Sequence, residues 1–291
     1  MRGVVGLGFS AALIYGGSDF LGGFAARRLA SLTVTLVAFV AGLVVTLPLL
    51  AVVSSAWTTS AVVYGAVAGV AGASSIWLLY ACLAMGPISV LAPLVALLAA
   101  LLPVAFGLAR HEHLGPVGVA ALCTVVVAGA LLGYTPGGRG EPLRMRALVI
   151  AVLAGLATGG YLIALDFTPP DSGVAPVAVD FAAGAILLGL AIALRSRVRR
   201  RNRSCPVEAA PETQTEPLAY AAVSGGTQAV ADVLVVIGIH AGHLAIMAAL
   251  IALYPVGTIV LAIVITNERP GRLQLVGIAL AIAASTVLSV S

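Results

Sequence analysis

Ten apolar segments, each close to the length that crosses a lipid bilayer, constrain this chain more than any other feature. A transmembrane helix needs about 20 predominantly apolar residues. Charged residues make up only 9% of the 291 residues, whereas a soluble domain uses roughly 25% to cover its surface. Because backbone groups in hydrocarbon must pair internally, the pattern predicts an all-α integral membrane protein with ten transmembrane helices. The predicted spans are 4–24, 33–53, 60–84, 87–109, 114–134, 146–167, 173–194, 218–240, 243–266 and 271–290.

The arginines indicate how these spans are oriented. All 15 basic residues are arginine, and with ten spans only Arg2 and Arg110 fall on the side of the termini. Because arginine-rich loops stay in the cytoplasm, we expect a multi-pass protein of the cytoplasmic membrane with both termini extracytoplasmic. The basic loop 195–217 is interpreted as an orientation signal and linker, with anionic lipid headgroups as the alternative role. Arginines confined to such loops point to membrane lipid as a partner and not to nucleic acid.

An internal repeat divides the chain into two halves, 1–135 and 144–291. Without a gap, Gly86 lies over Gly242, Glu112 over Glu268, and Gly115 over Gly271 when the second half is placed on the first. Each half holds five spans, and an odd number inverts the second copy relative to the first. The sequence therefore predicts two inverted five-helix repeats, which is the plan of many secondary transporters.

Two motifs give this plan a family resemblance. The first span contains Tyr-Gly-Gly-Ser-Asp-Phe at 15–20, and the ninth span leads into a pattern made of Pro255, Glu268, Arg269 and Gly277. Both are similar to motifs of the EamA-like branch of the drug/metabolite transporter superfamily. The resemblance implies a ten-helix transporter that exports, or less often imports, small metabolites or drugs.

Polar side chains inside the spans are the candidate substrate-binding residues, because they are costly in lipid. Ser224, Gln228 and Asp232 recur every four residues and so share one face of the eighth span. They either bind the solute or hydrogen-bond neighbouring helices. Asp19 lies about 12 Å from the predicted cytoplasmic end of the first span, in the inner half of the membrane. We expect it at the floor of a cavity or at an inner gate.

The third and seventh spans add further candidates. Tyr80 and Trp77, close to Ser74 and Ser75, offer the aromatic and hydroxyl surface of a ligand cavity, with core packing or interfacial anchoring as the alternative. An unpaired carboxyl group deep in hydrocarbon is most stable as the neutral acid. Asp180 and Asp232 are therefore the candidates for proton coupling.

These observations favour a secondary transporter of small organic metabolites or drugs that works by alternating access, with export and proton coupling as further expectations. No phosphate-binding loop for ATP and no cofactor motif is present. The spans also lack a catalytic histidine, so an enzyme is not expected. The solute and the oligomeric state are not specified.

Two other functions stay open at this stage. A histidine and glutamate cluster in the predicted outer loops suggests a metal-ion exporter or a metal-regulated carrier. The arginine loop suggests a non-catalytic scaffold or a lipid-binding protein, although neither role explains the repeat. The cluster consists of His111, Glu112, His113, His240 and His243.

Overall fold

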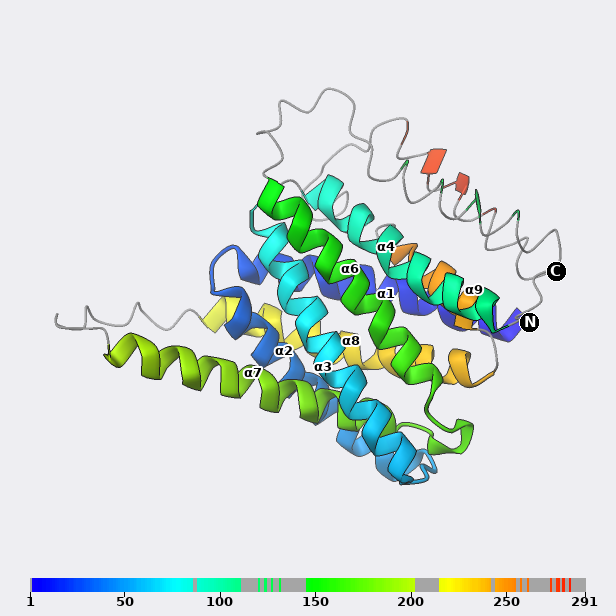
Figure 1. Ribbon diagram of the computed structural model, residues 1–291, viewed down its shortest axis with the longest axis horizontal. Coiled ribbons are helices and arrows are strands. Elements are labelled where there is room, and N and C mark those ends of the chain that lie inside the picture. The colour runs from blue at the N-terminus through cyan, green and yellow to red at the C-terminus, as the bar shows by residue number, and fades with distance from the viewer. Residues whose placement is uncertain are drawn as a thin grey trace.

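The computed structural model describes residues 2–85, 88–110, 145–201, 215–241 and 244–254, with isolated residues in 120–131 and 257–283. Every regular element within these ranges is helical (Figure 1). The elements are α1 (Arg2–Ala26), α2 (Ser31–Val52), α3 (Thr59–Leu83), α4 (Ile88–Ala109), α6 (Met145–Asp166), the short 3-10 helix η1 (Pro170–Ser172), α7 (Ala175–Arg201), α8 (Thr215–His240) and α9 (Leu244–Ile251).

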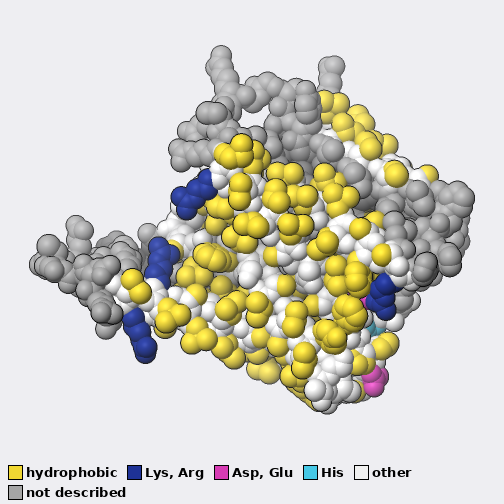
Figure 2. Space-filling view, viewed as in Figure 1, with side chains coloured by type: hydrophobic (Ala, Val, Ile, Leu, Met, Phe, Trp, Pro, Cys, Tyr) yellow, Lys and Arg dark blue, Asp and Glu magenta, His cyan; other side chains and the backbone are white. Residues whose placement is uncertain are grey.

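Six of the described helices are long and apolar enough to cross a membrane, namely α1, α2, α3, α6, α7 and α8. Their outward faces carry exposed large apolar side chains at helical spacing, such as Val40, Val44 and Leu47 on α2. Figure 2 shows apolar side chains covering the middle of the visible face, with basic side chains towards its two ends. The chain is therefore a multi-pass α-helical membrane protein.

The predicted limits of the seventh span and its basic loop are wrong by several residues. The span was expected to end at residue 194, but α7 continues to Arg201, and α8 already begins at Thr215. Nothing between 195 and 201 breaks a helix, and arginine is a good helix former. Cations in the last turns also interact favourably with the negative end of the helix dipole. The C-terminal end of α7 extends beyond its neighbours in Figure 1.

The ninth span was expected over 243–266, where the described residues are helical at 244–251 and at positions 254, 257 and 261. Helix α9 ends at Ile251, and Ala252 and Leu253 form a turn. The proline at position 255 explains the break, because it has no N–H for the carbonyl of Ile251 and disfavours helical geometry in the residue before it. The predicted fifth and tenth spans lie outside the described residues, apart from single positions that are helical.

The most extensive helix contacts join the two predicted halves. Helix α1 packs on α8, and α3 packs on α6; α2 packs on α8, and α3 packs on α7. In the predicted repeat, α1 corresponds to α6, α2 to α7, α3 to α8 and α4 to α9. The contact of α1 with α8 then corresponds to that of α6 with α3, and the contact of α2 with α8 corresponds to that of α7 with α3. Contacts of α4 with α6 and of α9 with α1 are related in the same way. The bundle is thus interlocked and does not divide into two side-by-side domains.

The same exchange relates individual contacts at the centre of the bundle. A Cβ atom added at Gly42 of α2 would meet the ring of Phe181, and one added at Gly184 of α7 would meet the ring of Phe39. The two rings lie 5.2 Å apart between centroids. Helices α2 and α7 therefore cross through reciprocal phenylalanine and glycine contacts, in which each helix contributes one ring and one glycine.

Two further glycines bring helices from different halves into backbone contact. Gly225 of α8 packs against the backbone of Ala38 in α2, and Gly69 of α3 packs against the backbone of Asp180 in α7. Any side chain at these positions would collide with main-chain atoms, which cannot rotate away.

Ion pairs lie at opposite ends of the bundle. Arg28 pairs with Glu216 at 3.2 Å, which joins the end of α1 to the start of α8. Arg110 pairs with Asp166 at 2.5 Å, which joins the ends of α4 and α6. Near the second end, the backbone N–H of Val174 donates to Ser55 Oγ at 3.0 Å. These contacts place the end of α1 with the start of α8 at one end of the bundle, and the ends of α4 and α6 together at the other.

Candidate functional site

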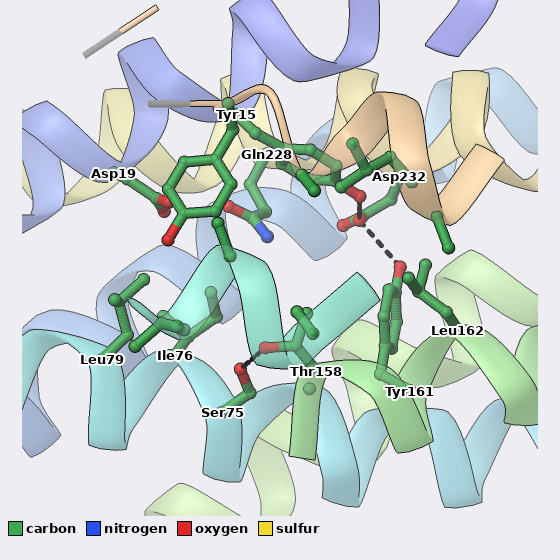
Figure 3. Close-up of a pocket in the computed structure, with 18 of the residues that line it drawn as sticks. Tyr15, Asp19, Ser75, Ile76, Leu79, Thr158, Tyr161, Leu162, Gln228 and Asp232 are labelled. Carbon is green, nitrogen blue, oxygen red and sulfur yellow. Dashed lines mark hydrogen bonds between the residues drawn. The ribbon is translucent and has the colours of Figure 1, made fainter. Parts of the chain in front are cut away.

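A cavity lies among the helices, and each of the eight described long elements contributes side chains to it. The empty space is about 740 Å³ when its open side is counted. Most of the surface is apolar or aromatic, and the polar groups are few (Figure 3). The lining residues are Tyr15, Asp19, Phe39, Gly72, Ser75, Ile76, Leu79, Val95, Ala96, Ala99, Thr158, Tyr161, Leu162, Asp180, Phe181, Gln228, Asp232, Ala248, Ile251, Ala252 and Tyr254.

The cavity brings together the three carboxyl groups that the sequence places inside spans. Asp19 comes from α1, Asp180 from α7 and Asp232 from α8, and all three residues are buried. Asp19 and Asp180 each lie close enough to Asp232 to interact with it electrostatically. Three helices that are far apart in the sequence thus direct their only in-span carboxyl groups to one place.

Asp232 is held by two tyrosines, one from each half of the chain. Tyr161 Oη donates a 2.7 Å hydrogen bond to Asp232 Oδ1, and Tyr15 Oη donates to the same oxygen. Because both rings are buried and line the cavity, the carboxyl group is fixed in position between α1 and α6. Asp19 follows Tyr15 by about one helical turn towards the predicted cytoplasmic end.

Asp180 has a different environment. Its Oδ1 atom is buried and has no hydrogen-bond partner within the described part of the chain. Gly72 of α3 leaves space beside it, because a Cβ atom there would lie 3.4 Å from Asp180 Oδ1 and 3.3 Å from the Tyr161 ring. A buried acceptor without a donor is uncommon and calls for an explanation.

The polar face of α8 is divided between two roles. Ser224 lies outside the cavity lining and bonds across to α1, where Ser18 Oγ donates to the Ser224 carbonyl oxygen at 2.8 Å. Ser18 Oγ also lies 3.0 Å from Gln228 Oε1, and Gln228 lines the cavity with Asp232. Ser224 thus joins helices, and the next two polar residues face the cavity.

Two aromatic candidates from the third span do not line the cavity. Tyr80 is buried, and its hydroxyl lies 2.9 Å from Ser224 Oγ, where it extends the contact between helices. Trp77 is 39% exposed on the outer surface of α3. Ser75 does line the cavity and hydrogen-bonds to Thr158.

Several lining residues were not predicted from the sequence. Thr158 and Tyr161 lie on α6, and Phe39 and Phe181 lie on the crossing pair α2 and α7. Tyrosine hydroxyls within apolar spans would have been a usable signal for Tyr161. Nothing in the sequence distinguishes the two phenylalanines from ordinary core residues.

The metal-binding hypothesis rests mostly on residues outside the described ranges, namely His111, Glu112, His113 and His243. His240 is described, and its Nε2 lies 2.8 Å from Thr168 Oγ1 at the end of α8. Within the described residues there is no group of three or more His, Cys, Asp or Glu side chains that would hold a metal ion.

Comparisons with known proteins agree with this architecture. The sequence model of the EamA-like transporter family matches residues 145–290. A crystal structure of another protein is similar over 99% of this chain and 96% of its own, with a TM-score of 0.72 and 23% sequence identity. At that identity the likeness concerns the fold alone. No match was found among curated proteins.

Proposed function

Because the chain belongs to the EamA-like transporter family, we propose that it is a secondary transporter that moves small organic metabolites or drugs across the cytoplasmic membrane by alternating access. The observation that carries the proposal is the cavity shared by both halves, in which Gln228, Asp232, Asp19 and Asp180 meet. Polar groups buried among membrane helices usually mark the path of a solute. A scaffold that acts through the arginine loop does not require such a cavity.

The proposed mechanism uses the two inverted repeats as the moving parts. The reciprocal contacts of Phe39 with Gly184 and of Phe181 with Gly42 support a pseudo-two-fold axis close to the cavity. Rocking of one repeat against the other about such an axis exposes the same site to each side of the membrane in turn. Each half supplies one tyrosine to Asp232, so this carboxyl group lies where the two halves meet.

Proton coupling is assigned to Asp180 and Asp232. The groups that surround them are the hydroxyls of Tyr15 and Tyr161 and the carboxyl group of Asp19, and no described lining residue carries a positive charge. Carboxyl groups that share a low-dielectric site cannot all be ionised without a cation. A proton therefore offsets the charge when the solute is absent, and export is driven by proton entry.

The decisive experiment is counterflow of a radiolabelled metabolite panel in proteoliposomes at imposed pH gradients. We expect at least one solute to exchange across the membrane and its flux to depend on the gradient. The Asp180→Asn and Asp232→Asn variants should lose that dependence, while Asp171→Asn, an exposed position in η1, should keep it. Absence of flux for every solute would reject the transporter proposal, and unchanged coupling in both cavity variants would reject these proton sites.

The proposed orientation has its own test. A chain that keeps Cys205 in the arginine loop, with serine at Cys82 and Cys123, should resist a membrane-impermeant thiol reagent in intact cells. Introducing Asp171→Cys into a chain without its native cysteines provides the matched outer position, and this variant should react. Labelling of Cys205 from outside would contradict the proposed orientation and indicate the opposite one.

A further inference from the structure

The ionisable carboxyl groups of the cavity are not balanced by any basic side chain among the described lining residues. Asp19, Asp180 and Asp232 line it, and none of the described lining residues is Lys, Arg or His. The two tyrosine hydroxyls on Asp232 are neutral donors, so they orient the carboxyl group without cancelling its charge. An anionic solute would meet repulsion from any ionised carboxylate here, whereas a cationic solute would be attracted.

One carboxyl oxygen of Asp180 has no hydrogen-bond donor within the described residues, and this indicates which kind of cation the cavity would bind. Asp232 already receives two hydrogen bonds, but Asp180 Oδ1 receives none within the described residues and faces the space next to Gly72. A buried acceptor gains most from a donor that arrives with the solute. Such a donor must carry an N–H or O–H group, which excludes a quaternary ammonium ion as the best ligand.

The side chains that line the cavity indicate the chemistry of the rest of the solute. Aromatic rings of Phe39, Phe181, Tyr15 and Tyr161 line it together with aliphatic residues of α3 and α4. Aromatic faces attract cations, and aliphatic walls favour an apolar body over a hydrated inorganic ion. An apolar molecule with a single charged end matches both properties.

On the basis of the proposed transport function, we infer that the solute is a protonated amine with an apolar body. Its ammonium N–H donates to Asp180 Oδ1, the carboxylate of Asp232 offsets its charge, and its apolar part lies against the aromatic walls. Asp19, about one turn from Tyr15 on α1, supplies a further negative charge on the predicted cytoplasmic side of this position.

Equilibrium binding to the full-length protein in lipid nanodiscs tests this inference with radiolabelled 2-phenylethylamine as the probe. Unlabelled amine should compete at least about tenfold better than 2-phenylethanol or the trimethylammonium analogue, because neither of these provides a charged N–H. Equal competition by the alcohol or by the quaternary ion would overturn the inference. Displacement of the amine when NaCl replaces KCl would overturn it in favour of an inorganic cation.

Binding of the same probe to variants of the protein locates the site. Asp180→Asn should weaken binding of the amine at least about tenfold, and Asp171→Asn should leave it unchanged. Unchanged binding in Asp180→Asn would overturn the assignment, and the ligand series on the unmodified protein keeps the test independent of how well this variant folds. Counterflow of non-amine solutes without amine binding rejects the amine but keeps the transporter. Amine binding without any flux keeps the amine site and rejects transport.

Discussion

Gly225 on α8 and Gly69 on α3 occupy equivalent places in the two halves, and each brings its helix against the backbone of a helix from the other half. About two turns further along the same helices the equivalence ends, because Asp232 lines the cavity from α8 and Ile76 lines it from α3. The neighbours of the reciprocal phenylalanines differ in the same way. Asp180 precedes Phe181, whereas an alanine precedes Phe39.

The first helix of each half repeats this difference. If the glycine pair 16–17 of α1 is placed on the pair 159–160 of α6, Asp19 corresponds to Leu162, and both line the cavity. Every carboxyl group of the cavity therefore has an apolar counterpart. Contacts that hold the helices together are duplicated, but the carboxyl groups of the cavity are not, so the two predicted halves contribute different chemistry to the proposed solute site.

The largest effect is expected from substitutions that disrupt the glycine contacts found in both halves. Gly225→Ala and Gly69→Ala should each lower the free energy of unfolding by about 3 kcal/mol, because the new methyl group would collide with main-chain atoms. Thermal unfolding and the fraction of monodisperse protein after solubilisation would measure this loss. Gly160→Ala on α6 is the matched control, since a Cβ atom there meets nothing within 4 Å. Equal stability of all three variants would contradict the close approach.

The next effect tests whether the two halves contribute equally to the crossing of α2 and α7. Phe39→Ala and Phe181→Ala should each cost about 2–3 kcal/mol, somewhat below the usual range for a sealed core because both rings also face the cavity. The two losses should agree within about 1 kcal/mol in thermal unfolding. A loss confined to one variant would show that the reciprocal contacts are not energetically equivalent.

A smaller effect concerns the unduplicated chemistry. Tyr15→Phe and Tyr161→Phe should each reduce solute flux about tenfold, because each removes one hydrogen bond to Asp232 while the other remains. Tyr80→Phe is the matched control, since its hydroxyl bonds to Ser224 away from the cavity. Initial rates of counterflow would measure the three variants. A loss in Tyr80→Phe equal to the other two would indicate a structural effect in place of a site effect.

The smallest effect compares the two ends of the bundle. Asp166→Asn and Glu216→Gln remove the ion pairs with Arg110 and Arg28, and each should change the free energy of unfolding by less than about 1 kcal/mol. Asp166 should have the larger effect, since its side chain is 16% exposed and that of Glu216 is 72% exposed. Both differences should shrink at high salt in thermal unfolding. A larger loss in Glu216→Gln would contradict this order.

The sequence was sufficient to predict the membrane class, the family and the limits of most described helices, because apolar length and charge density depend on local composition. It did not predict the turn at Ala252 and Leu253, since the apolar signal continues across the proline at position 255. It also placed the end of α7 too early, because polarity marks the edge of the membrane and not the end of a helix. Both errors come from treating hydropathy as a measure of backbone structure.

The site was predictable to the extent that polar side chains in lipid are rare. Asp19, Asp180, Asp232 and Gln228 were singled out for that reason, and all four line the cavity. Trp77 was singled out for its residue type, but its direction depends on how α3 is rotated in the bundle. Neither composition nor spacing determines that rotation, and the same applies to the unpredicted lining residues on α2 and α7.

The interlocked packing also dictates the order of events during synthesis. Helices α1 to α4 reach the bilayer before their main partners on α6 to α9 exist. At a synthesis rate of about 5–20 residues per second, roughly 10 to 40 s separate the appearance of α1 from the completion of α8. During that interval Ser18 lacks Ser224, and Asp19 has no cavity around it, so both are exposed to lipid or to the insertion machinery. The first half therefore passes through an unfinished state each time the protein is made.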